Sequence, residues 1–254
     1  MQQLLTQHQS LYYAWQLTRR AAGNSMESLA PTLVDSQVDL NPHQVEAALF
    51  ACANPLSRGV ILADEVGLGK TIEAGLVISQ RWAERRRRIL IIVPANLRKQ
   101  WHQELQDKFN LQAILLEAKS YNALRKQDRR NPFQGATGPV ICSYQFAKAK
   151  ADDIKAVEWD LVVLDEAHRS YNPKGSFLAN LYQSDPNAIK IALTGTPLIV
   201  DEDKAKKNPD YKAISSKQIF GDYIHKYYYN ASIADGYNEV PRHLFLESVF
   251  EDFA

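Results

Sequence analysis

The feature that most constrains the fold of this chain is a series of short apolar runs separated by longer amphipathic segments. Uninterrupted short apolar runs are typical of strands buried on both faces, and helices between them are typical of a parallel sheet. Such runs occupy residues 60–62, 89–93, 113–116, 140–143, 161–164 and 189–193. We therefore predict an α/β fold in which helices cover both faces of a parallel sheet.

Three of the amphipathic segments carry helix signals. Asn41 and Pro42 suit the N-cap and the first helical position of one helix. A second helix is expected from Lys70 to the arginines at 85–88, whose charge favours a helix carboxyl end. A third is expected at 96–109, where apolar residues recur at helical spacing.

A glycine-rich loop follows the first apolar run and opens the second helix. Its sequence, at 63–71, is Ala-Asp-Glu-Val-Gly-Leu-Gly-Lys-Thr. The two glycines allow the backbone to turn its N–H groups toward a triphosphate at the helix N-terminus. Lys70 can reach the β- and γ-phosphates, and Thr71 can ligate Mg²⁺. Asp64 stands where the general phosphate-loop pattern has glycine, but the strand–loop–helix setting still predicts an ATP site.

Two acids follow the apolar run at 161–164, within the sequence Asp-Glu-Ala-His at 165–168. In an open α/β sheet, ligands bind at the carboxyl ends of the strands. Asp165 is therefore placed to hold Mg²⁺ through water, and Glu166 to orient and activate the attacking water. A third polar segment, Thr-Gly-Thr at 194–196, could sense the γ-phosphate, although taken alone it would indicate a plain turn.

In this order the three motifs resemble those of superfamily-two helicases, and the loop variant with Asp64 resembles the Swi/Snf-type branch in particular. Leu-Asn-Pro-His-Gln at 40–44 is similar to the glutamine motif of that branch, whose glutamine contacts adenine. The segments 93–97 and 141–145 are similar to motifs that border the nucleic-acid path. The resemblance extends over 37–197 and implies a RecA-like P-loop NTPase lobe.

The motifs and the resemblance together assign roles, with ATP and Mg²⁺ as cofactors. The expected catalytic residues are Lys70, Asp165 and Glu166. The expected nucleotide-binding residues are Gln44, Asp64, Glu65, Val66, Gly67, Leu68, Gly69, Lys70 and Thr71. Coupling of hydrolysis to movement is expected from His168, Thr194, Gly195 and Thr196, and Mg²⁺ ligation from Thr71 and Asp165. The expected nucleic-acid contacts are Pro94, Asn96, Lys99, Ser143, Tyr144 and Gln145.

The carboxyl-terminal third shows a second resemblance. The segments at 168–171, 219–227 and 234–236 look more like the motor subunit of type I restriction enzymes. Both families are double-stranded DNA translocases, so duplex DNA is the implied partner in either case. A remodelling role and a role in restriction or bacterial defence both stay open.

We expect three parts: an N-terminal helical extension at 1–36, the ATP-binding lobe at 37–200, and an insertion with a carboxyl-terminal segment at 201–254. In this superfamily a second RecA-like lobe completes the ATP site with arginines. The 57 residues at 198–254 are too few for such a lobe. We therefore expect weak hydrolysis by this chain alone, and completion of the site by a second lobe or a partner subunit.

Composition limits what we expect of nucleic-acid contact, membrane contact and the two cysteines. The formal net charge is only +1, so nucleic-acid contacts are expected to be local. No apolar run is long enough to span a bilayer and the amino terminus is polar, which favours a cytoplasmic protein without membrane contact. Cys52 and Cys142 lie in apolar segments and are expected to be buried free thiols.

The leading functional hypothesis is ATP hydrolysis coupled to movement on double-stranded DNA. A nucleotide-dependent module that clamps DNA or a partner without moving would share every motif, and only ATP turnover that rises with duplex length separates the two. An unrelated phosphoryl-transfer enzyme such as a kinase is disfavoured by the acid pair at 165–166 and the threonine segment at 194–196.

Overall fold

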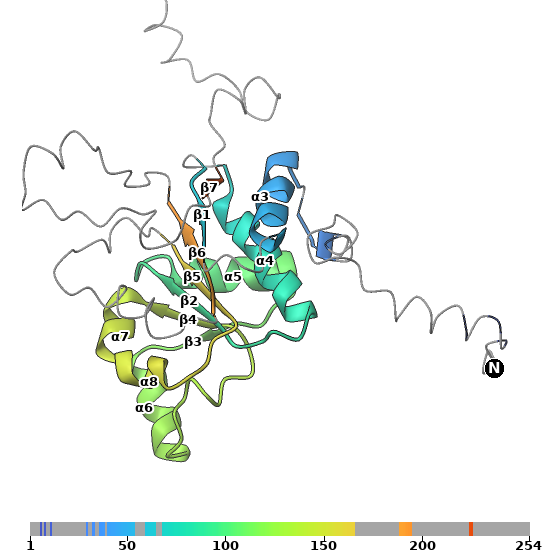
Figure 1. The fold of residues 1–254 in the computed structure, drawn as a ribbon. Coiled ribbons are helices and arrows are strands. Elements are labelled where there is room, and N and C mark those ends of the chain that lie inside the picture. The colour runs from blue at the N-terminus through green and yellow to red at the C-terminus, as the bar shows by residue number, and fades with distance from the viewer. Residues whose placement is uncertain are drawn as a thin grey trace, which may run out of the picture.

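A computed structural model gives the fold shown in Figure 1. It describes residues 6, 8, 11, 29, 32–33, 36–38, 40–53, 59–64, 68–165, 188–194 and 224–225, with only the backbone of 53, 224 and 225. No helix within these ranges is long and apolar enough to cross a bilayer.

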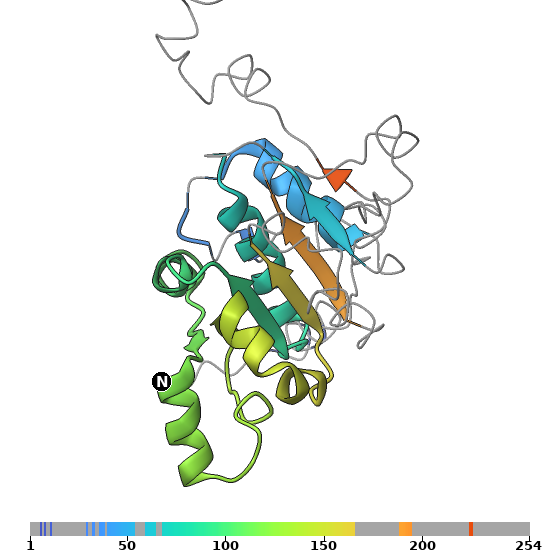
Figure 2. The same ribbon diagram turned by 90° about the vertical axis from the view of Figure 1, so that its left-hand side faces the viewer.

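The strands form one seven-stranded sheet in the order β3-β4-β2-β5-β6-β1-β7, and every neighbouring pair is parallel (Figure 2). Their bounds are Val60–Leu62 (β1), Ile89–Val93 (β2), Ile114–Leu115 (β3), Val140–Ser143 (β4), Leu161–Leu164 (β5), Ile189–Leu193 (β6) and Ile224–His225 (β7). The predicted parallel sheet is thus confirmed. The run predicted at 113–116 is shorter, and the edge strand β7 was not predicted.

Helices cover both faces of the sheet (Figure 1). Their bounds are Pro42–Ala53 (α3), Lys70–Ala83 (α4), Arg98–Phe109 (α5), Ala118–Gln127 (α6), Tyr144–Ala149 (α7) and Ala151–Lys155 (α8). The three predicted helices are α3, α4 and α5. The last begins two residues later than predicted because the chain first turns, with the Leu97 N–H donating to the Pro94 carbonyl at 3.0 Å.

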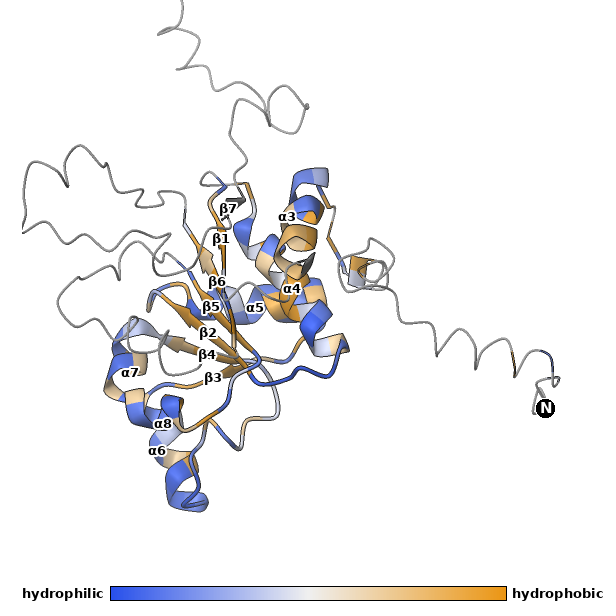
Figure 3. Ribbon diagram, viewed as in Figure 1, coloured by the Kyte–Doolittle hydropathy of each residue, from blue (hydrophilic) through white to orange (hydrophobic). Residues whose placement is uncertain are grey.

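Alternate residues of each central strand enter different apolar cores. In β2, Ile89, Ile91 and Val93 pack with residues of α3, α4 and α5. Leu90 and Ile92 instead pack with residues of α6, α7 and α8. Because both faces are covered, the central strands are apolar at nearly every position and appear mostly orange in Figure 3. The exceptions in these strands are Ser143 at the end of β4 and Lys190 in β6, whose buried Nζ donates to the Ala188 carbonyl at 3.2 Å.

Both cysteines are buried free thiols, as predicted. Burial raises the pKa of the Cys52 thiol to about 11 and that of the Cys142 thiol to about 12. The thiolate is the reactive form, so both side chains are inert packing groups near neutral pH.

Candidate nucleotide-binding site

The polar motifs of the sequence meet at one edge of the sheet because all the strands run in the same direction. The register pairs Leu62 with Leu193 and Val93 with Ser143, so these strands end level with one another. Beyond those ends, the strand order places the segments starting at residues 144, 94, 165, 194 and 63 side by side. The phosphate loop, the acid motif and the threonine segment therefore share one edge.

Gly69 completes the loop at the N-cap of α4 in a conformation that favours glycine. Its φ is +88°, and a Cβ atom there would lie 2.4 Å from Nε2 of Gln44. Among the described residues, no side chain caps this end of α4. An uncapped helix N-terminus beside a glycine turn is suited to bind an anion, and this arrangement fits a nucleoside triphosphate.

Gln44 holds the loop from the side of α3. Its Nε2 donates to the Leu68 carbonyl at 3.1 Å, and its Oε1 accepts from the Asn41 N–H at 3.2 Å. The second bond is the glutamine half of a capping box at the start of α3. Nε2 of His43 also lies 3.1 Å from the Leu68 carbonyl oxygen. The structure therefore adds a tethering role for Gln44, while its contact with adenine stays a prediction.

Lys70 lies beside two fully buried carboxyl groups. Its Nζ donates to the backbone carbonyl of Asp64 at 2.8 Å. The side chains of Asp64 and Glu73 are both 0% exposed, and no described group donates a hydrogen bond to either oxygen of Glu73. Two carboxylates are both acceptors, so a hydrogen bond between them requires a proton on one.

That proton is held by Glu73. The pKa of Glu73 is raised to about 9, mainly by burial and then by the neighbouring Asp64 carboxyl group, while Lys70 opposes the shift. Glu73 is therefore protonated at neutral pH. Glu73 was not among the predicted site residues, although Leu76, Val77 and Gln80 follow it at the spacing of one buried helix face.

Asp165 is held by hydrogen bonds from two other segments. The indole Nε1–H of Trp101 donates to its Oδ2 at 2.8 Å. The hydroxyl of Tyr144 donates to the backbone carbonyl of Asp165 at 2.6 Å. The backbone N–H of Asp165 donates to the Ile92 carbonyl at 3.0 Å. Trp101 was predicted only as part of an apolar helix face, because spacing along a helix does not reveal a partner for the indole.

Of the six residues predicted to contact nucleic acid, Tyr144 is half-buried and the other five fall into two groups. Asn96, Lys99 and Gln145 are exposed next to the edge where the motifs meet. Pro94 and Ser143 are buried, and the Ser143 hydroxyl accepts from the Phe146 N–H at 3.2 Å as the N-cap of α7. The first group is therefore better placed for phosphate contacts, and the Ser143 side chain already has a structural role.

Several predicted site residues lie outside the described part of the chain. They are Glu65, Val66, Gly67, Glu166, His168, Gly195 and Thr196. The segments with the restriction-type resemblance, at 168–171, 219–227 and 234–236, also lie outside it, apart from the backbone of 224–225. Thr194 is described, and its N–H donates to the Leu62 carbonyl at 3.1 Å, which joins the threonine segment to the strand before the phosphate loop.

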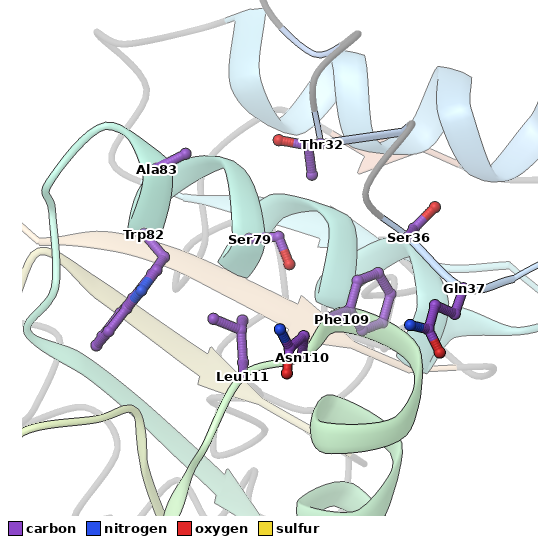
Figure 4. A pocket seen from close by; sticks show the side chains of 9 residues that line it. All are labelled: Thr32, Ser36, Gln37, Ser79, Trp82, Ala83, Phe109, Asn110 and Leu111. Atoms are coloured by element: carbon purple, nitrogen blue, oxygen red, sulfur yellow. The ribbon is translucent and has the colours of Figure 1, made fainter. Parts of the chain in front are cut away.

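A cavity of about 420 Å³ lies at the opposite end of α4 (Figure 4). Its lining residues are Thr32, Ser36, Gln37, Ser79, Trp82, Ala83, Phe109, Asn110 and Leu111. Ser79 is nine residues beyond Lys70 along the helix, which separates them by roughly 13 Å. The cavity is therefore distinct from the predicted nucleotide site.

The fold and the strand-edge motifs define a RecA-like domain of the superfamily-two helicase class. The SWI2/SNF2 ATPase core of Sulfolobus solfataricus, solved in complex with double-stranded DNA, matches with a TM-score of 0.56 at 22% identity, over 76% of this chain and 45% of that one. The Hef helicase domain of Pyrococcus furiosus matches with a TM-score of 0.59 at 18% identity, over 78% of this chain and 40% of that one.

The chain belongs to the SNF2-related domain family, which matches residues 6–205. It is therefore an SNF2-family ATPase domain of the helicase-like kind. RNA polymerase-associated protein RapA of Serratia proteamaculans is 43% identical over 136 residues, which are 52% of this chain and 14% of that protein. RapA of Pectobacterium atrosepticum is 39% identical over 171 residues, 63% of this chain and 17% of that protein. The chain thus spans only about a sixth of these relatives.

Proposed function

We propose that this chain is the first ATP-binding lobe of a motor that couples MgATP hydrolysis to movement on double-stranded DNA. The observation that carries the proposal is the meeting of the phosphate loop, Asp165 and Thr194 at one sheet edge, beside the exposed residues Asn96, Lys99 and Gln145. Membership of the SNF2-related family supports the motor class. The duplex DNA bound by the similar archaeal core supports double-stranded DNA as the track of the motor.

The residue roles follow the chemistry of the side chains. Lys70 would neutralise the β- and γ-phosphates, while Thr71 and Asp165 would hold Mg²⁺, which screens charge on the transferred phosphoryl group. Glu166 would orient the attacking water. Glu65, Val66, Gly67 and Gly69 would contact the phosphates through the backbone, and His168, Gly195 and Thr196 would respond to the γ-phosphate.

The larger organisation is also part of the proposal. Residues 37–200 form the lobe, with the extension at 1–36 before it and the segment at 201–254 after it. A second RecA-like lobe or a partner subunit supplies the arginines that complete the site. Membership of the SNF2-related family favours a Swi/Snf-type role over restriction or defence. Action inside the cytoplasm, on DNA, agrees with this role.

Binding of a fluorescent ATP analogue in Mg²⁺ tests the nucleotide site. Lys70→Ala should abolish binding, whereas Glu166→Gln should bind as the parent does. Equal binding by the Lys70→Ala variant would show that the site assignment is wrong.

Duplex DNA of increasing length then separates the motor from its alternative. A motor completed by its second lobe should hydrolyse ATP faster as the duplex lengthens. A nucleotide-dependent clamp that does not move should bind the same duplexes with turnover independent of their length.

A further inference from the structure

Side chains of two different segments donate hydrogen bonds to Asp165 at the edge of the sheet. The Trp101 indole reaches its carboxylate from the first turn of α5, at 2.8 Å. The Tyr144 hydroxyl reaches its backbone carbonyl from the first residue of α7, at 2.6 Å. The contacts come from opposite faces of the sheet, since α5 and α7 pack against different cores. The Trp101 indole therefore helps to orient the carboxylate, and the Tyr144 hydroxyl helps to hold the backbone that carries it.

The Trp101 contact does more than bury an aromatic ring. Trp101 is only 1% exposed, and a buried indole N–H needs an acceptor. Trp159, another buried tryptophan, meets that need with the backbone carbonyl of Ile154 at 3.0 Å. Trp101 instead donates to the carboxylate that the proposed function assigns to Mg²⁺.

Trp101 and Tyr144 each lie in a hydrogen-bonded segment that also carries exposed residues at the predicted nucleic-acid path. The Trp101 N–H donates to the Leu97 carbonyl at 2.9 Å, and the Leu97 N–H donates to that of Pro94. Asn96 and Lys99 are exposed within this hydrogen-bonded unit. Gln145 is exposed directly after Tyr144, in a helix whose start is fixed by the Ser143 cap. A displacement of either segment by a bound strand must therefore act on Asp165.

We propose that Trp101 and Tyr144 are positioning residues that transmit nucleic-acid contact at α5 and α7 to the Mg²⁺ ligand Asp165. The inference rests on the proposed function and adds to it the route by which DNA regulates the ATP site. Coupling of this kind is reciprocal, so DNA must change the affinity for Mg²⁺-bound nucleotide by the same factor as nucleotide changes that for DNA.

The contact itself is measurable without nucleotide or metal. The chain has four tryptophans, so a ¹⁵N-labelled sample gives four indole N–H signals, and Trp101→Phe assigns one of them. Asp165→Asn should shift that signal and leave the Trp159 signal in place. Addition of a duplex of about 20 base pairs should shift the Trp101 signal too. A Trp101 signal that ignores bound duplex would overturn the proposal.

The coupling is measured as the Kd of a fluorescent ATP analogue in Mg²⁺, with and without the duplex. We expect the duplex to change the Kd of the parent about fivefold or more, the lower range of known couplings. Trp101→Phe should bring the ratio close to one without altering the Kd measured in EDTA, and Tyr144→Phe should bring the ratio close to one as well.

Matched controls separate coupling from packing. Trp159→Phe removes an equally buried indole, and Tyr121→Phe removes a hydroxyl bonded to Asp153, both away from Asp165. These two variants should keep the parent ratio. Retention of that ratio by Trp101→Phe and Tyr144→Phe as well would overturn the coupling alone. A parent that binds neither nucleotide nor duplex would overturn the proposed function, and the coupling with it.

Discussion

Asp64 and Asp165 occupy equivalent places in the fold, each directly beyond a buried parallel strand, yet their surroundings differ. Asp64 is fully buried beside the carboxyl group of Glu73, which is protonated at neutral pH. Asp165 is also buried, at 9% exposed, but it receives a hydrogen bond from a neutral donor, the Trp101 indole. The strand edge brings both acids to the site, but their partners decide their chemistry. Asp64 belongs to a buried acid pair beside Lys70, whereas Asp165 carries the proposed role of a Mg²⁺ ligand.

The largest expected effect is on the free energy of unfolding and concerns the surroundings of Asp165. Trp101→Ala leaves a large cavity in the core below Asp165 and removes the donor to its carboxylate. Large-to-small core substitutions of this kind cost about 3–5 kcal/mol. Urea unfolding followed by circular dichroism measures the loss, and a change below about 1 kcal/mol would mean that the ring does not support this edge.

The next effect concerns the acid pair and depends on pH. The pKa of Glu73 rises from its ordinary 4.5 to about 9 on folding, so the native state binds more protons between these values. The free energy of unfolding should therefore fall as the pH rises through this window, by up to roughly 2 kcal/mol between pH 5.5 and 7.0.

Glu73→Gln is the matched variant for this pH effect, because it keeps the size of the side chain and removes the titration. Its unfolding free energy should lose that slope, measured by urea titration in EDTA at each pH. The same slope in the parent and the variant would assign the pH dependence to another group.

A smaller effect tests the loop between Asp64 and Glu73. Gly69→Ala places a Cβ atom 2.4 Å from Nε2 of Gln44 and forces alanine to a φ of +88°. We expect a loss of about 1–3 kcal/mol, the range for backbone strain of this kind. Thermal unfolding measures it, and unchanged stability would show that Gln44 moves aside without cost.

The smallest expected effect concerns the second contact of Asp165, which is the hydrogen bond from the Tyr144 hydroxyl. Tyr144→Phe removes one hydrogen bond to a backbone carbonyl and should cost about 0.5–1.5 kcal/mol. The dependence on pH attributed to Glu73 should be unchanged, since Tyr144 touches Asp165 and not the acid pair. A Tyr144→Phe variant whose unfolding free energy has an altered pH slope would mean that Asp165 and Glu73 are not independent.

The sequence alone predicted most of the elements that position the site. Apolar runs such as 89–93 and 161–164 identified strands because both faces of the sheet are covered. Lys70 was placed at a helix start by the glycine turn before it. The short helices α7 and α8 were not predicted, because six and five residues carry too little periodicity to distinguish a helix from a loop.

The sequence by itself determined the class of site: a glycine turn with Lys70 and Thr71 after one buried strand, and an acid after another. These signals are local, because burial and turn geometry leave periodic traces in neighbouring residues. Only the tertiary structure decided the order of the strands and the partner of each carboxyl group. Trp101 and Asp165 are 64 residues apart and meet only because β2 and β5 pair under α5. The energy of a side-chain contact depends on distance in space, and spacing along the chain does not record that distance.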